Sequence, residues 1–82
     1  MYKILFDKDA GKFIEKLPNN IGTQILKKID SSAEEPFLFF ERLSGRQEFK
    51  LRIGKYRVIA DISRNEQTIS IRKIGLRKNI YD

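Results

Sequence analysis

Apolar and polar residues alternate along residues 49–53 and again along residues 56–62. This two-residue period is typical of strands with one buried face. Between the two runs stands Gly54-Lys55, which predicts a two-residue turn, because glycine tolerates the positive φ that the first turn position needs. That turn places Arg52 opposite Arg57. The apolar side chains of both strands then share one face, and the other face carries Lys50, Arg52, Arg57, Ile59 and Asp61.

The first half of the chain predicts one strand and two helices. Residues 2–6 alternate and form a short strand. Apolar residues then recur at three- and four-residue spacings over residues 10–17, which indicates an amphipathic helix that Asp7 can cap. A second apolar stripe over residues 21–33 predicts another helix, with Asn19 or Asn20 as its cap. The short connection makes the two helices an antiparallel hairpin.

The remaining segments complete an α+β fold. Residues 37–40 are three phenylalanines and a leucine, which we interpret as a buried connector; the alternative is an exposed patch for a protein partner. Residues 68–74 predict a last strand, followed by a short tail. We therefore expect a single domain spanning residues 1–82. It has a mainly antiparallel four-stranded sheet, with the N-terminal helical hairpin packed on one face and the other face open to a ligand.

Charge separates the two halves of the chain. Residues 1–41 hold 6 Lys/Arg and 7 Asp/Glu, a net of −1, whereas residues 42–82 hold 11 Lys/Arg and 4 Asp/Glu, a net of +7. The basic charge thus lies in the half that holds the strand hairpin. Such an asymmetry suggests a polyanion or an acidic protein as partner, and the alternative is charge that serves solubility.

The absence of two residue types limits the catalytic and metal-binding chemistry available to the chain. The chain has no cysteine and no histidine, which excludes disulfides, thiolate metal sites and a histidine base. We expect no metal and no cofactor. No segment resembles a signal peptide and no apolar run is long enough to span a membrane. A cytoplasmic location, with its reducing environment, fits this composition.

The outer face of the C-terminal strands is the candidate site. Arginine holds phosphate through two parallel hydrogen bonds, so arginines on rigid strands suit phosphate recognition. RNA supplies its own nucleophile, the 2′-hydroxyl, and arginines can stabilise the charge on the attacked phosphate. Lys50 is a candidate base, because neighbouring positive charges disfavour the charged form of a lysine. Asp61 is interpreted as an ion-pair partner for an arginine. The face and tail together offer Lys50, Arg52, Arg57, Arg72, Arg77, Lys78 and Tyr81.

Three motifs resemble one family. The segment 42–45 (RLSG), the hairpin 51–59 (LRIGKYRVI) and the ending 77–81 (RKNIY) are similar to the RelE/ParE superfamily of toxins from prokaryotic type II toxin–antitoxin modules, above all to its RelE branch. The resemblance covers the whole chain in element order and length. It implies an mRNA interferase that cuts mRNA in the ribosomal A site, without metal, by attack of the 2′-hydroxyl. It also implies an acidic helical antitoxin of RelB type that wraps around the toxin in a hetero-oligomer.

The resemblance also assigns roles. Lys50 and Arg52 match the basic pair of the strand before the turn, one of which is the base. Arg57 matches the arginine that stabilises the phosphate, Arg77 an arginine of the C-terminal motif, and Tyr81 the tyrosine that stacks on a base or orients the nucleophile. Many relatives carry histidine where this chain has leucine at position 76, so a histidine-based mechanism is excluded. RNA contacts are further expected from Lys55, Arg72 and Lys78.

Two other functions stay open at this point. The first is a ParE-like toxin of the same fold that binds DNA gyrase and cuts no RNA. The second is a basic binding module without activity.

Overall fold

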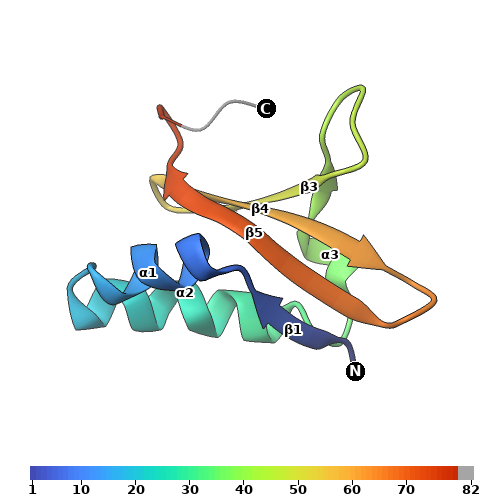
Figure 1. Cartoon of the computed structure of the whole chain (residues 1–82), viewed down its shortest axis with the longest axis horizontal. Helices are drawn as coiled ribbons and strands as arrows, with labels where there is room; N and C mark the ends of the chain where they lie inside the picture. Colours follow the sequence, from blue (N-terminus) through green and yellow to red (C-terminus); the bar gives the residue numbers. More distant parts are fainter. Residues whose placement is uncertain (80–82) are drawn as a thin grey trace.

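The chain folds into a curved sheet with two helices against its inner side (Figure 1). The computed structural model describes residues 1–79. In chain order the elements are β1 Lys3–Phe6, α1 Lys8–Glu15, α2 Asn19–Ser31, α3 Pro36–Phe39, β2 Glu41–Arg42, β3 Phe49–Ile53, β4 Tyr56–Ser63 and β5 Thr68–Leu76. The predicted α+β class, with its helical hairpin on one face of a mainly antiparallel sheet, is confirmed.

The sheet has five strands in the order β1-β5-β4-β3-β2, one more than predicted. The extra strand, β2, pairs only Glu41 with Lys50 and Arg42 with Phe49. Two residues are too few to show a period in the sequence. Every pair is antiparallel except β1 and β5, which run parallel at one edge.

The central hairpin has the predicted register. Arg52 faces Arg57 and Ile53 faces Tyr56 across β3 and β4. Gly54 has a φ of 56°, the left-handed region that the turn demands of its first residue. The inner face of β3 and β4 is buried, with Leu51 and Val58 only 3% and 0% exposed. The local pattern was therefore sufficient to fix this hairpin.

Helices α1 and α2 lie side by side below the sheet in Figure 1, as an antiparallel hairpin. They approach closely at Gly22, where a Cβ atom would lie 3.4 Å from Cγ2 of Ile14. Asp7 occupies the N-cap position of α1, as predicted, although its side chain makes no capping hydrogen bond. The predicted cap of α2 was wrong, because Pro18 and not Asn19 or Asn20 holds that position. Among residues 1–79, no helix has both the length and the apolar content to cross a membrane.

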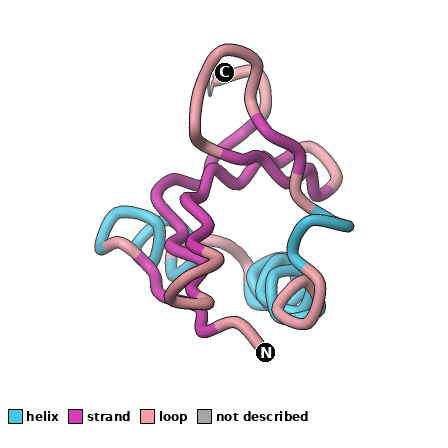
Figure 2. The backbone as a smooth tube through the Cα atoms, turned by 90° about the vertical axis from the view of Figure 1, so that its right-hand side faces the viewer, coloured by secondary structure: helices cyan, strands magenta, loops and turns pink. Residues whose placement is uncertain are grey.

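Residues 37–40 form the predicted connector, but only part of it is buried. Phe40 is 4% exposed, and the Phe37 ring packs edge-on against Phe49 with centroids 5.5 Å apart. Phe37 and Phe39 are half-buried, and Leu38 is 81% exposed. Figure 2 shows how the sheet curves around this core, with α2 seen end-on inside the curve.

The outer face of the sheet is not entirely open. Leu43 and Ile59, 1% and 5% exposed, form a small second apolar cluster apart from the main core. A tight turn follows Leu43, closed by a hydrogen bond from the Arg46 N–H to the Leu43 carbonyl, with Gly45 at a φ of 70°. The expectation of a bare outer face is corrected, because Leu43 packs on Ile59 there.

A β-bulge interrupts β5. Ile59 pairs with Lys73 while the next residue, Ala60, pairs with Ile71. Arg72 is therefore an extra residue without a partner position on β4, and the alternation of β5 shifts by one after it. The shift buries both Ile71 and Ile74, which simple alternation cannot do.

Candidate functional site

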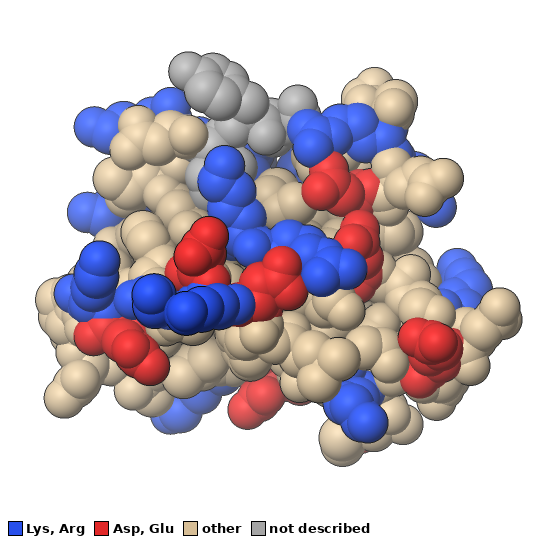
Figure 3. Space-filling view, in the orientation of Figure 1, with Lys and Arg blue, Asp and Glu red and all other residues tan. Residues whose placement is uncertain are grey.

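A groove of about 550 Å³ lies beside the hairpin turn and the end of β5. Its lining is Lys55, Arg57, Leu76, Arg77 and Lys78, so every charged side chain in it is positive. We call it the basic groove. In Figure 3, Lys and Arg gather at the upper left, whereas acidic and basic side chains alternate across the middle of this face. A lining whose charged side chains are all positive favours an anionic ligand.

The hairpin turn holds the end of β5 in place. The Arg77 N–H donates a hydrogen bond to the Lys55 carbonyl at 2.9 Å, and its Nη1 donates to the Gly54 carbonyl at 3.3 Å. A further bond, from the Asn79 N–H to the Leu76 carbonyl at 2.9 Å, tightens the chain just beyond. The two parts of the predicted site, turn and tail, therefore meet through main-chain carbonyls. Because every residue has a main-chain carbonyl, residue types alone could not predict this role of the Gly54 and Lys55 carbonyls.

Arg57 lines this groove and belongs to the outer face of β4. Its side chain is half-buried and its Nε atom is buried, whereas Arg52, directly opposite, is exposed. Opposed residues in an antiparallel pair have Cβ atoms about 5 Å apart, so the two guanidinium groups can bind one phosphate together.

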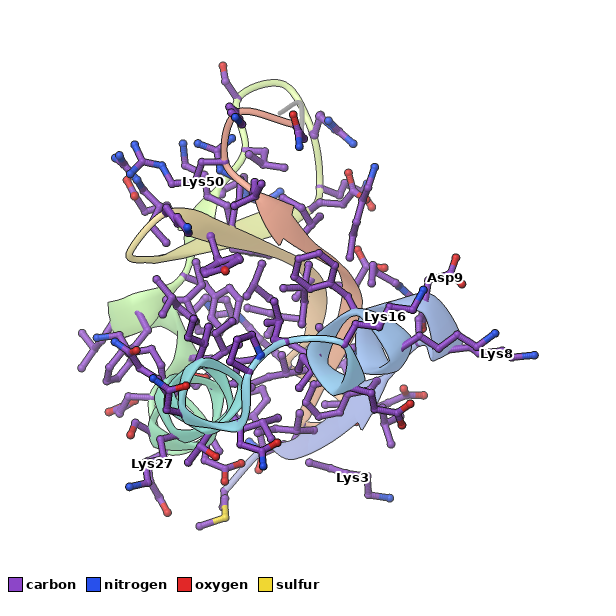
Figure 4. The ribbon with its side chains drawn as sticks, turned by 90° about the vertical axis from the view of Figure 1, so that its left-hand side faces the viewer. Lys3, Lys8, Asp9, Lys16, Lys27 and Lys50 are labelled. Carbon is purple, nitrogen blue, oxygen red and sulfur yellow. The ribbon has the colours of Figure 1, made fainter. Side chains whose placement is uncertain are left out.

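Lys50 lies farther along the same face, two residues from Arg52. Figure 4 shows it on the side of the sheet away from α1 and α2. It is half-buried, and its partners in the sheet are Glu41 on β2 and Ile59 on β4. The neighbouring Glu41 was missed, because β2 itself was not predicted.

Arg72, in contrast, is engaged by two carboxylates. Its Nε donates to Asp61 at 2.8 Å and its Nη1 donates to Asp7 at 3.1 Å. These bonds, first that to Asp61 and then that to Asp7, raise the pKa of the Arg72 guanidinium. Asp61 is thus the ion-pair partner we predicted. Because Asp61 and Asp7 already bind the Arg72 guanidinium, the expected contact of Arg72 with RNA has the least support of those predicted.

The other predicted residues divide by position. Lys55 and Lys78 are exposed and line the basic groove. Tyr81 lies outside the described residues. Among residues 1–79, no group of three or more acidic side chains could hold a metal ion. The charged side chains that line the basic groove are cations, which can bind a phosphate and stabilise added negative charge on it.

Comparison with known proteins supports the resemblance. Residues 4–81 match the family described as ParE toxin of type II toxin–antitoxin system, parDE. No curated protein matches the sequence. Solved structures do match, among them RelE toxins on their own and in complexes with RelB.

Three of these structures illustrate the likeness. A chain of the RelBE2 toxin–antitoxin complex from Mycobacterium tuberculosis has a TM-score of 0.83 at 24% identity, over 93% of this chain and 98% of that one. The isolated Escherichia coli RelE toxin has a TM-score of 0.81 at 23% identity, over 93% and 84%. The RelB–RelE complex from Methanococcus jannaschii gives 0.71 at 25%, over 95% of both chains. With the family match spanning residues 4–81 and the fold shared throughout, this chain belongs to the RelE/ParE toxin superfamily of type II toxin–antitoxin systems.

Proposed function

We propose that this toxin is a ribosome-dependent endoribonuclease that cleaves mRNA in the A site and so inhibits translation. The observation that carries the proposal is the meeting of Arg57 and Arg77 in one basic groove, with Arg52 directly opposite Arg57. A toxin that only binds a protein surface does not require arginines gathered around one groove. A cleaving enzyme does, because the attacked phosphate gains negative charge.

The proposed step uses the RNA's own nucleophile. The 2′-oxygen bonds to the neighbouring phosphorus as its proton leaves to a base, and the bond from phosphorus to the 5′-oxygen breaks as that oxygen takes up a proton. The product ends are a 2′,3′-cyclic phosphate and a 5′-hydroxyl. Arg57, supported by Arg52 and Arg77, stabilises the pentavalent phosphate. Lys50 serves as the base, which leaves Arg52 to support Arg57, and Tyr81 stacks on a base or orients the hydroxyl.

The proposal includes partners. The likeness to toxins solved with RelB supports a cognate acidic, helical antitoxin that covers the basic face in a toxin–antitoxin hetero-oligomer. Lys55 and Lys78, at the rim of the groove, then contact the mRNA backbone or ribosomal RNA. The toxin acts in the cytoplasm, where translating ribosomes are.

A second candidate is inhibition of DNA gyrase without RNA cleavage. The observation that favours it is the family match, whose description is a ParE toxin. In that case the cationic groove would bind a protein surface, and no single arginine would be needed for a chemical step.

Inducible expression with mapping of mRNA ends on translating ribosomes separates the two candidates. Cuts inside A-site codons that disappear in Arg57→Ala and persist in Lys27→Ala, an exposed lysine of α2, support the endonuclease. We expect Arg57→Ala to lower the cleavage rate by about 100- to 1,000-fold, as removal of one transition-state donor does. Growth arrest with intact mRNA and loss of plasmid supercoiling would overturn the proposal in favour of gyrase.

A further inference from the structure

A second groove, of about 580 Å³, lies at the opposite end of the β3–β4 hairpin. Its aromatic floor includes Phe37 of α3 and Phe49 of β3. Two arginines, Arg42 and Arg64, stand over these rings. Two residues with amide side chains, Gln47 and Asn65, also line the groove. We call it the aromatic groove.

The arginines of this groove are held by the rings. The Arg64 guanidinium carbon lies 4.0 Å from the centre of the Phe37 ring, and that of Arg42 lies 5.0 Å from the centre of the Phe49 ring. Arg64 comes from the β4–β5 turn and Arg42 from β2, so two distant segments place cations on one aromatic pair. A guanidinium over a ring is oriented before any ligand arrives, while its N–H donors remain available in its plane.

We propose that the aromatic groove is a second nucleic-acid contact, which takes a nucleotide of single-stranded RNA. The base stacks on one guanidinium, and the phosphate binds the N–H groups of the other. The inference rests on the proposed function only in taking RNA as the ligand. The groove would bind RNA outside the cleavage site and so hold mRNA or ribosomal RNA in position.

The lining chemistry favours RNA over an acidic peptide. A peptide carboxylate needs hydrogen-bond donors alone. Gln47 and Asn65 each offer a donor and an acceptor, which is what the edge of a base requires. No acidic residue is among those that line the groove in the described part of the chain, so a phosphate meets no repulsion there.

The two grooves are separate. In Figure 1, the Gly54-Lys55 turn lies at the left end of the hairpin and the β4–β5 turn at the right. Strand β4 connects them, and at about 3.3 Å per residue the distance from Arg57 to Ser63 is roughly 20 Å. A variant in one groove therefore leaves the other intact, and the two RNA contacts can be tested independently.

The test measures binding of a fluorescent 2′-O-methyl RNA, which cannot be cleaved by 2′-hydroxyl attack. Affinity is followed by anisotropy from 50 to 300 mM salt for the full-length toxin and for R42Q/R64Q. The matched control K8Q/K27Q removes the same charge from exposed helix positions that Figure 4 shows on the helical side. Thermal unfolding verifies that each variant is folded. Arg64→Lys keeps the charge but loses the planar fork, and it tests the geometry of the contact.

We expect R42Q/R64Q to bind about 10-fold more weakly and to lower the salt slope by about 1, since each phosphate that a protein neutralises on a single strand adds roughly 0.7 to that slope. K8Q/K27Q should bind like the parent, and Arg64→Lys should fall between. Equal affinity and equal slope for R42Q/R64Q and K8Q/K27Q would overturn the inference. So would competition by polyglutamate as effective as competition by RNA. Failure of the proposed function is distinguishable, since absent mRNA cleavage leaves this binding result unchanged.

Discussion

The guanidinium of Arg77 donates a hydrogen bond to the main-chain carbonyl of Gly54 at 3.3 Å. These residues are 23 positions apart, yet this bond and the one from the Arg77 N–H to Lys55 fix the end of β5 against the hairpin turn. The turn therefore has two roles. It sets the register of Arg52 and Arg57, and it positions the third arginine of the candidate site.

Substitution of Gly54 tests the positioning role. Its φ is 56°, and a Cβ added there would meet no atom within 4 Å, so the cost of Gly54→Ala is backbone strain alone. We expect a loss of about 1–2 kcal/mol in unfolding free energy. As the turn relaxes and Arg77 shifts, the cleavage rate per folded molecule should fall by about 10- to 100-fold.

Gly54→Asn is the matched control, because asparagine tolerates positive φ. It should lose less stability and retain more activity than Gly54→Ala. Chemical denaturation and cleavage on ribosomes measure both quantities. If both variants lose activity equally, the Arg77–Gly54 contact has no positioning role.

Arg52→Gln should stabilise the fold while lowering activity. Removing one of two like charges directly opposed in a strand pair relieves repulsion, and we expect a gain of about 0.2–1 kcal/mol. The cleavage rate should fall on the order of 100-fold, as a phosphate-stabilising cation is lost. Because salt screens the repulsion, the gain should shrink in 1 M salt.

Arg46→Gln provides the comparison for this variant. It removes the same charge from the loop after β2, where Arg46 pairs with Glu48. It should give no stability gain at low salt. A stability gain as large as that of Arg52→Gln would mean that net charge, and not the facing arginine pair, limits stability.

Arg72→Gln should leave cleavage unchanged, because Asp61 and Asp7 already neutralise this guanidinium. The thermal midpoint should fall slightly, since these ion pairs are partly exposed. The bonds raise the pKa of Arg72, so their stabilisation is fully present around neutral pH, below the unfolded pKa of this group, and is lost as the pH rises into strong alkali. The difference in midpoint between parent and variant should therefore be constant from pH 6 to 9. Loss of cleavage in a folded Arg72→Gln protein would contradict this prediction and show that Arg72 contributes to the candidate site.

Leu43→Ala tests the small cluster on the outer face. Leu43 is 1% exposed against Ile59, and its truncation should leave a cavity and cost about 2–3 kcal/mol. Leu38→Ala, at a leucine 81% exposed, should change stability by less than about 0.5 kcal/mol. Denaturant titration measures both. Equal effects would mean that Leu43 does not pack on Ile59 in solution.

The sequence alone determined the features that depend on neighbours along the chain. Alternation and Gly54 fixed the central hairpin and the opposed Arg52–Arg57 pair, because the strand period and the turn are local properties. The two apolar stripes at helical spacing likewise predicted α1 and α2. The class of fold follows from these elements, since each must bury its apolar face against another.

Only the tertiary structure decided which distant segments meet. The parallel pairing of β1 with β5, the bulge that directs Arg72 to Asp7 and Asp61, and the bond from Arg77 to Gly54 all join residues far apart in sequence. Such pairings have no local period, because burial of the whole core and compensation of separate charges select them together. The sequence motifs therefore predicted most of the lysines and arginines of the candidate site, and long-range packing determined which of them share a groove.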